Sequence, residues 1–244
     1  MNKLFSTAVA IGCVSVFGSC HMRELKGAGE KTTNTVNTSS CTSLDISIPA
    51  KAEITVQAGA EPSVKISGYN NLLDHIKTSN NGCMLKIYSD LTDGRSLDSH
   101  AGTIITVVMP SLSVLELSGA TDANIHGAAR SSKFELSISG ASNVAIDSIF
   151  ADEFNTSVSG AASIAVNGGA AKRVKYALSG ASKIYAFPFI TGTTIAEISG
   201  AGRAEVNATD TLSASVSGTG TIHYKGHPQV QKEVSGVGSV KDAN

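Results

Sequence analysis

The chain of 244 residues has no tryptophan, and its aromatic content is only 5%. Charged residues are also scarce at 16%, and the formal net charge is only −1. A chain without an excess of positive charge is not expected to bind nucleic acid or an anionic membrane surface through electrostatic attraction. Apolar residues make up 41% of the sequence, which excludes extensive disorder and indicates a packed protein.

Small and β-branched residues are abundant instead. The 24 glycines occur among many Ser, Ala, Thr and Val residues, a mixture typical of short strands joined by tight turns. Long helices are therefore not expected. At this length the chain could form one large all-β domain or two small ones.

The second half of the chain repeats a Ser-Gly pair flanked by alternating apolar residues. The copies read ELSGATDANI, SISGASNVAI, SVSGAASIAV, ALSGASKIYA, EISGAGRAEV, SVSGTGTIHY and EVSGVGSVKD. Their glycines are Gly119, Gly140, Gly160, Gly180, Gly200, Gly218 and Gly236. A regular spacing of 18 to 21 residues indicates a repeat protein.

Each repeat predicts a strand, a turn at the glycine and a second strand, with the apolar residues of both strands facing one interior. A unit of this size cannot bury its own apolar face, so the copies must stack in parallel at about 4.8 Å per coil. The glycines should supply positive φ, and the serine hydroxyls should bond to neighbouring turns. The predicted fold is an all-β, single-stranded, right-handed parallel β-helix, or β-solenoid, with coils of about 20 residues.

The N-terminus has the pattern of an export signal followed by an attachment site. Residues 1–19 combine Lys3 with an apolar stretch that is too short to span a membrane as a helix. Cys20 follows the tripeptide FGS, which resembles the bacterial lipobox, where the cysteine is lipidated. The alternative is a plain cleaved signal with an incidental cysteine. Lipidation would anchor the protein in the cell envelope, and we expect the outer membrane, on either its surface or its periplasmic side.

Residues 20–40 lack apolar periodicity and are rich in Thr, Asn, Ser and Gly, which predicts a flexible tether behind the lipidated cysteine. The β-helix domain is expected over residues 41–244. Its first part, 41–110, contains irregular strands with period-two alternation, and its second part, 111–244, holds the regular repeats. Within the first part, NNLLDHIKT could form one short helix or a loop, and residues 91–102 should form an exposed loop.

Cys41 and Cys83 remain once the leader and the lipidation site are set aside. In an oxidising envelope compartment they could pair and close a loop of about 40 residues, which would stabilise the fold by about 3–4 kcal/mol. The alternative is that both are small buried hydrophobic residues. The sequence leaves the two possibilities open.

No catalytic or metal-binding pattern is evident. The outward positions after each glycine place Asp147 and Glu205 three coils apart, which is too far for a pair of cooperating carboxylates. The Gly-x-Gly steps are explained as turns. A glycine separates His223 from His227 and a proline follows, so no helix brings both to one metal. The sequence therefore predicts no enzyme activity, no catalytic residue, no metal site and no cofactor.

One outward cluster stands apart from this background. In KIYAFPFI, Tyr185 and Phe187 are expected on the outer face of one coil, with Asn167 on the coil before and Asn207 on the coil after. Exposed aromatic rings beside amide side chains could stack on a sugar and hydrogen-bond to it, or contact a protein. The alternative is that Pro188 redirects the strand, so that the rings cover a turn or the side of the solenoid.

The chain resembles a known family over about residues 41–240, the bacterial adhesin-like proteins of the head GIN domain family. The resemblance rests on ISIPAKAEITVQAG, SVKISGYNNLLDHIKT, NGCMLKIYSD and the LSGAS-type repeats. It implies a right-handed β-helix in an envelope lipoprotein, with adhesion as a suggested role and no established catalytic residues.

Several functions remain open from the sequence. One is a non-catalytic envelope lipoprotein that presents its β-helix, as an adhesin or scaffold, to a glycan or a protein ligand. Another is a structural or sensing component of the periplasm, and a third is a polysaccharide-processing enzyme. The oligomeric state is not indicated.

Overall fold

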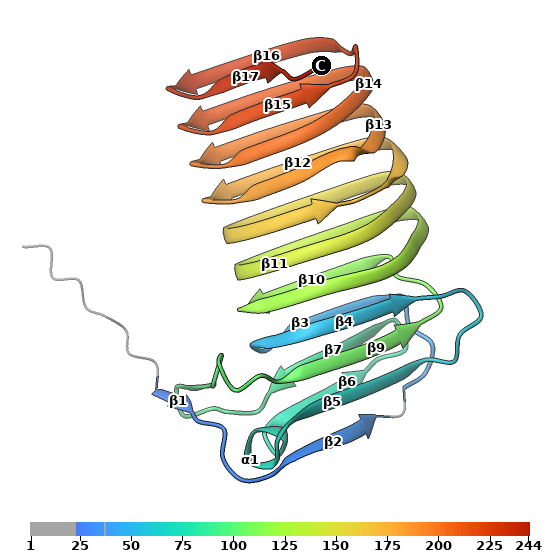
Figure 1. Ribbon diagram of the computed structural model, residues 1–244, viewed down its shortest axis with the longest axis vertical. Coiled ribbons are helices and arrows are strands. Elements are labelled where there is room, and N and C mark those ends of the chain that lie inside the picture. The colour runs from blue at the N-terminus through green and yellow to red at the C-terminus, as the bar shows by residue number, and fades with distance from the viewer. Residues whose placement is uncertain (1–22, 37) are drawn as a thin grey trace, which may run out of the picture.

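The computed structural model describes residues 23–36 and 38–244, so the predicted leader and Cys20 lie outside the described residues. The protein is a β-solenoid of about six turns with coils of roughly 20 residues (Figure 1). Neighbouring coils pair in parallel along the regular part. The predicted all-β solenoid is confirmed, while its right-handed sense stays a prediction.

The regular part is formed by strands that bend around the corners of the solenoid. They are β10 (Val114–Gly119), β11 (Thr121–Val166), β12 (Gly169–Gly180), β13 (Lys183–Gly200), β14 (Arg203–Gly218), β15 (Thr221–Lys225), β16 (Gln229–Gly236) and β17 (Ser239–Asp242). Strand β11 contains 46 residues and runs through more than two coils without interruption. The pairing is therefore continuous along the stack.

The repeat glycines form a ladder along one edge of the stack. All seven have positive φ, between 94° and 130°. A Cβ added at Gly160 would also lie 2.3 Å from the carbonyl oxygen of Gly140 on the preceding coil. The predicted role of the glycines is thus confirmed. The serines that precede them are exposed, and hydroxyls that bond to the turns come from other positions, such as Ser182 Oγ, which donates to the Gly160 carbonyl at 3.2 Å.

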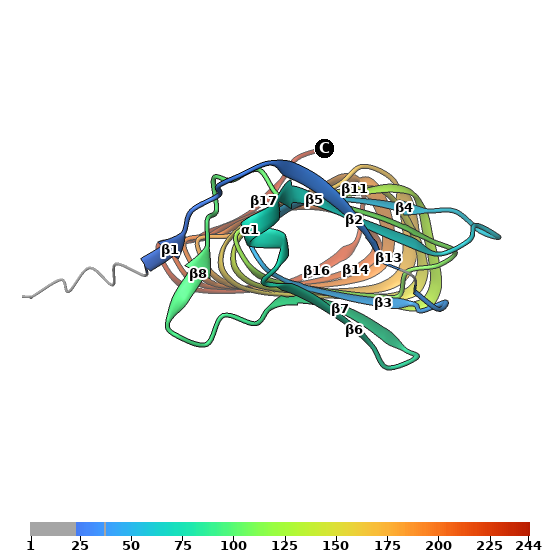
Figure 2. The same ribbon diagram turned by 90° about the horizontal axis from the view of Figure 1, so that it is seen from below.

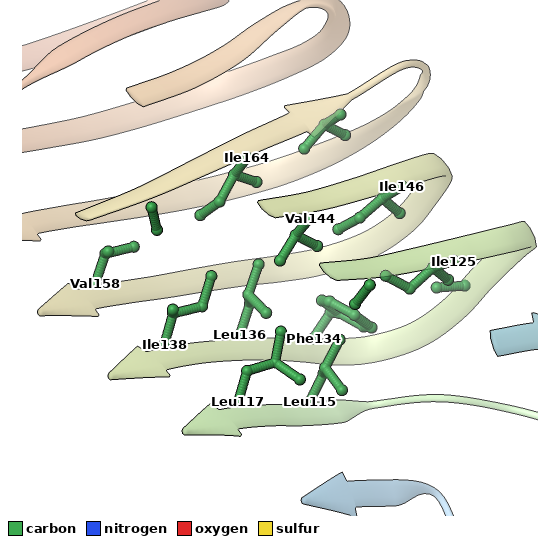
Figure 3. Packing of buried hydrophobic residues seen from close by; sticks show 14 of the residues in the cluster. Leu115, Leu117, Ile125, Phe134, Leu136, Ile138, Val144, Ile146, Val158 and Ile164 are labelled. Atoms are coloured by element: carbon green, nitrogen blue, oxygen red, sulfur yellow. The ribbon is translucent and has the colours of Figure 1, made fainter. Parts of the chain in front are cut away.

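The core fills the lumen between the two strand layers. Figure 3 shows Leu115 and Leu117 below Leu136 and Ile138, all pointing into the lumen, and these leucine and isoleucine side chains are buried. Aromatic residues fill the centre of the stack, with ring centroids 5.6 to 5.9 Å apart, namely Phe134, Phe154, Tyr176 and Phe189. The inward positions predicted from the repeats are therefore correct.

The first part of the domain continues the solenoid in an unexpected order. Strands β3 (Ser43–Ser47) and β4 (Ala50–Val56) pair with β10 and β11. Strands β7 (Met84–Ser89) and β9 (Ile104–Met109) pair with the other edges of β3 and β4. The coil formed by β3 and β4 thus lies between the first regular coil and the coil formed by β7 and β9. The order of the coils along the stack therefore differs from their order in the sequence. All four pairings are parallel.

Antiparallel strands and a short helix close this end of the stack. Strand β6 (Ile76–Asn80) pairs with β7, β5 (Ser63–Tyr69) pairs with β9, and β2 (Lys31–Val36) pairs with β5. Helix α1 (Asn70–Leu73) buries Leu72 and Leu73 and lies over the end of the lumen in Figure 2. A short helix was one of the two predicted possibilities. Among residues 23–36 and 38–244, no helix is long and apolar enough to cross a membrane.

Two predictions about loops are wrong. Part of the predicted tether is ordered, because β2 pairs with β5 and β1 (Arg23–Leu25) pairs in parallel with β8 (Arg95–Leu97). Strand β8 lies inside the predicted exposed loop, where the Leu97 side chain is buried. The sequence predicted a flexible tether here because β2 shows no apolar alternation. It is a polar edge strand in which only the last residue is partly buried.

At the opposite end of the solenoid, the residues that the structure describes form no such cap. Strands β16 and β17 form the last coil, and most residues of β16 are exposed. The Val237 side chain is 82% exposed at this end. The two ends of the stack therefore differ in their surfaces.

Candidate functional site: the outer faces of the solenoid

The structure places the two aromatic side chains of the predicted cluster in different surroundings. Tyr185 is exposed and lies in register between Ala165 and Glu205 of the neighbouring coils. Phe187 is partly buried, and the Lys225 ammonium lies 5.0 Å from its ring centroid. The ring of Phe187 therefore contacts a cation of the protein itself.

The register between coils changes beside Pro188. Tyr185 aligns with Glu205 and Ile190 with Asn207, so the later coil is shorter here, whereas the earlier coil aligns Ala165 with Tyr185 and Ala170 with Ile190 without a shift. Proline has no N–H to donate to the ladder, and bulges are where such a residue is tolerated. The shift reflects the shorter coil that follows, and the redirection of the strand by Pro188 stays a prediction.

The two asparagines are held in different ways. The side-chain amide of Asn207 donates to the Phe187 carbonyl at 3.0 Å, so it links two neighbouring coils at the register shift. Asn167 is exposed, and its backbone N–H donates to the Ile146 carbonyl at 2.9 Å. A ligand-binding role for these four residues stays a prediction.

A polar network occupies the same face on earlier coils. The Glu53 carboxylate forms an ion pair with Lys51 at 2.9 Å and accepts hydrogen bonds from Asn124 at 3.1 Å and His126 at 2.8 Å. The bonds from Lys51 and His126 lower the pKa of Glu53 to about 2. Asp147 lies 3.7 Å from the other ring nitrogen of His126. A carboxylate that is ionised and bonded on both oxygens is suited to holding coils together rather than to proton transfer.

Three potential metal ligands lie together near the capped end. Glu24, Asp98 and His100 have ligand atoms within 4.8 Å of one another, because the pairing of β1 with β8 brings them together across the sequence. The Lys26 ammonium lies 2.6 Å from Glu24 and 3.4 Å from Asp98. This lysine pairs with both carboxylates and offsets one of their two negative charges, so the group is explained as a surface ion-pair cluster.

A hollow that the sequence did not indicate lies at a bend of the solenoid. Its volume is about 550 Å³, and it crosses three successive coils. The lining residues are Ser131, Ser132, Phe150, Ala151, Asp152, Ala170, Ala171 and Lys172. Sequence reasoning missed Phe150 because Ile149 next to it is buried, and the phase of the alternation changes at the bend.

Two smaller hollows lie on the flat face formed by the strands that precede the glycines. One of about 400 Å³ is lined mainly by serines of β11 to β14, and another of about 320 Å³ extends toward Asp45 and Glu116. The small side chains leave the backbone of this face close to the surface. No aromatic residue lines either hollow.

Cys41 and Cys83 are free thiols in the structure. Ser43 of β3 aligns with Met84 of β7. Cys41 precedes Ser43 by two residues, and Cys83 precedes Met84 by one. Cys41 is buried and Cys83 is exposed, which places the two thiols in different environments. Burial raises the pKa of the Cys41 thiol. The structure thus contains no Cys41–Cys83 disulfide, and only Cys41 fits the alternative of a small buried hydrophobic residue.

Comparisons with known proteins identify relatives of this fold. The family described as "Putative auto-transporter adhesin, head GIN domain" matches residues 44–228. A "putative adhesin" from Bacteroides fragilis is 22% identical, with a TM-score of 0.81 over 90% of this chain and 100% of that one. A "putative lipid binding protein" from Parabacteroides distasonis is 23% identical, with a TM-score of 0.70 over 91% of this chain and 100% of that one. A search of curated protein sequences finds no match.

Proposed function

Since the chain belongs to the head GIN domain family of adhesin-like proteins, we propose that it is a non-catalytic adhesin or binding scaffold of the cell envelope. It is anchored by a lipid on Cys20 and presents its solenoid to a glycan or protein ligand. The alternative role, a structural or sensing component of the periplasm, differs in where the solenoid is displayed.

The observation that supports binding over catalysis is the state of the outward carboxylates. Glycan hydrolysis requires two carboxyl groups about 5 to 10 Å apart on either side of one bond. Glu53 is engaged by Lys51 and His126, and Glu205 is bonded by Arg203 at 2.6 Å. Such contacts leave neither Glu53 nor Glu205 free to act as an acid or a base on a substrate. A scaffold with these properties is suited to presenting contact surfaces.

The position of Arg23, the first described residue, supports anchoring at the capped end. Strand β1 begins at Arg23 beside the cap, and the C-terminus lies at the other end of the stack (Figure 1). Cys20 precedes Arg23 by three residues, a span of at most about 11 Å. A lipid on Cys20 would therefore hold the capped end close to the bilayer, and the uncapped end would be distant from it.

The anchor is tested with two cysteine substitutions in the full chain. Cys20→Ser should move the protein from the membrane fraction to the soluble fraction, because the lipid is lost. Cys13→Ser, seven residues earlier in the leader, is the matched control and should leave the protein with the membranes. Release by both substitutions, or by neither, would contradict a lipid on Cys20.

Display is tested by protease treatment of intact cells, with a periplasmic protein as the internal control. Loss of the solenoid while the control survives is expected for an adhesin, and cells that lack the protein should then adhere less to a glycan-coated or protein-coated surface. Protection of both proteins would refute surface adhesion and would favour the periplasmic component.

A further inference from the structure

We infer that the hollow at the bend is a saccharide-binding groove, in which a sugar ring packs against Phe150 while its hydroxyls bond to Asp152 and Lys172. This inference rests on the proposed adhesin function and gives it a specific site. The groove is distinct from the Tyr185 cluster that the sequence suggested. Its residues come from three consecutive coils.

Small residues form the floor of the groove. Ala151 and Ala171 align on neighbouring coils, and Ser131 continues the row on the coil before. Three coils at about 4.8 Å per step give a floor about 10 Å long. A volume of about 550 Å³ is within the range of small-ligand sites. Larger side chains in this row would fill the space, so the dimensions of the groove depend on these small residues.

Phe150 forms the apolar wall of the groove and is held by a contact with Arg130. Its side chain is 38% exposed, and the Arg130 guanidinium lies 4.2 Å from the ring centroid. This contact is a cation–π interaction, which fixes the ring. Arg130 does not line the groove, whereas Phe150 does, so part of the ring remains available to a ligand. A sugar ring has faces of C–H groups that can pack on an aromatic ring, as other apolar groups do.

Asp152 and Lys172 form the polar wall. Their side chains pair at 2.7 Å and are 50% and 75% exposed. The ion pair with Lys172 lowers the pKa of Asp152. A carboxylate has about four acceptor sites and an ammonium has three donors, so both retain hydrogen-bonding capacity after pairing. Since each sugar hydroxyl both donates and accepts, a wall that offers both functions fits a polyhydroxylated ligand.

Size and charge favour a neutral saccharide over a protein partner. The exposed apolar residues at this bend are Phe150 and Ile190, with Ala170 between them in register. A stable protein interface buries about 800 Å² on each partner, which is far more than these side chains provide. The opposite charges of Asp152 and Lys172 cancel, and the Arg130 guanidinium is engaged with the Phe150 ring, so the groove presents no cluster of like charges to a polyanion or a polycation.

The absence of tryptophan makes the groove directly observable. Phe150→Trp keeps an aromatic wall and introduces a single tryptophan, and Tyr185→Trp provides the matched control on the other face. The protein is first applied to an array of immobilised oligosaccharides that end in glucose, galactose, mannose or N-acetylglucosamine. The sugars that bind are then titrated in soluble form into both variants.

The expected result is a saturable change in the fluorescence of Phe150→Trp and none in that of Tyr185→Trp. Phe150→Ala should weaken binding about tenfold or more, and Asp152→Asn should also weaken it, while Tyr185→Ala should leave the affinity unchanged. Circular dichroism checks that each variant retains the strand content of the parent protein.

Failure of the groove and failure of the proposed function give different results. Array binding that survives Phe150→Ala would overturn the groove and leave the adhesin function intact. Binding to no sugar would also overturn the groove, and the cell adhesion assay would then decide the function separately. If cells that lack the protein adhere normally as well, both proposals fall.

Discussion

The glycine ladder yields a stability prediction that separates two physical effects. Gly119 begins the ladder and Gly160 lies within it, and both have positive φ, 102° and 130°. A Cβ at Gly119 would meet nothing within 4 Å, whereas a Cβ at Gly160 would lie 2.3 Å from the Gly140 carbonyl oxygen. Gly119→Ala therefore introduces backbone strain alone. Gly160→Ala introduces the same strain and a collision with the neighbouring coil.

The magnitudes follow from these geometries. A φ of 102° lies in a region that L-residues rarely adopt and costs about 1–3 kcal/mol, so Gly119→Ala should lower the free energy of unfolding by about that amount. At Gly160 the two coils must also separate by about 1 Å, which weakens ladder hydrogen bonds worth about 1 kcal/mol each and disturbs the packing beneath them. We expect a loss of about 3–5 kcal/mol. Ser159→Ala, at the exposed neighbouring position, should change stability by less than about 0.5 kcal/mol.

The assay is urea unfolding followed by far-ultraviolet circular dichroism at constant pH and salt, with the slope of the transition compared among variants. A repeat protein can lose cooperativity, and a changed slope would reveal this. Losses at Gly119 and Gly160 that agree within 1 kcal/mol would refute the reasoning, because close approach of the coils would then not be what requires glycine.

Three further predictions concern the core, the polar network and the uncapped end. The hydroxyl of buried Tyr176 has no hydrogen-bond partner among the described residues, so Tyr176→Phe should leave the melting temperature unchanged or raise it, and a clear decrease would contradict this. The pKa of Glu53 is about 2 in the folded protein, below its ordinary value of 4.5. Its ionised carboxylate therefore stabilises the fold above pH 4.5 by up to about 3 kcal/mol. That stabilisation is lost as the pH falls from 4.5 toward 2. Glu53→Gln should flatten the stability profile in that window, and an unchanged profile in urea titrations would refute the assignment. Lys232 aligns with buried Ala214, so it places a charge on the core row of the last coil, whose strand edge is unpaired in the described part of the chain. Lys232→Val should therefore promote self-association, which sedimentation velocity would detect. A variant that sediments like the parent would show that this lysine does not protect the edge of the last coil.

The repeats made most of the solenoid predictable, because inward residues such as Leu136 and Ile164 recur at fixed distances from each glycine and the lumen accepts only apolar side chains. The order of the first coils was not predictable. Parallel pairing of β3 with both β7 and β10 depends on contacts between segments distant in sequence, and local alternation carries no information about them.

The candidate sites were less predictable than the fold. The register shift beside Pro188 could not be placed, because it depends on how two coils of unequal size align. Phe150 could not be placed, because an apolar pair at a bend does not reveal which of its members faces outward. The contact of Glu53 with His126 depends on the register between the first coils and the repeats.

The division of each strand into inward and outward residues has an evolutionary consequence. Inward residues determine whether a coil stacks, whereas outward residues contact only solvent and the same positions of adjacent coils. Selection can therefore replace the outward residues of one coil, or duplicate or delete a whole coil, without altering the cap or the remaining core. A lineage that uses this architecture can diversify what its surface contacts while it retains the same fold.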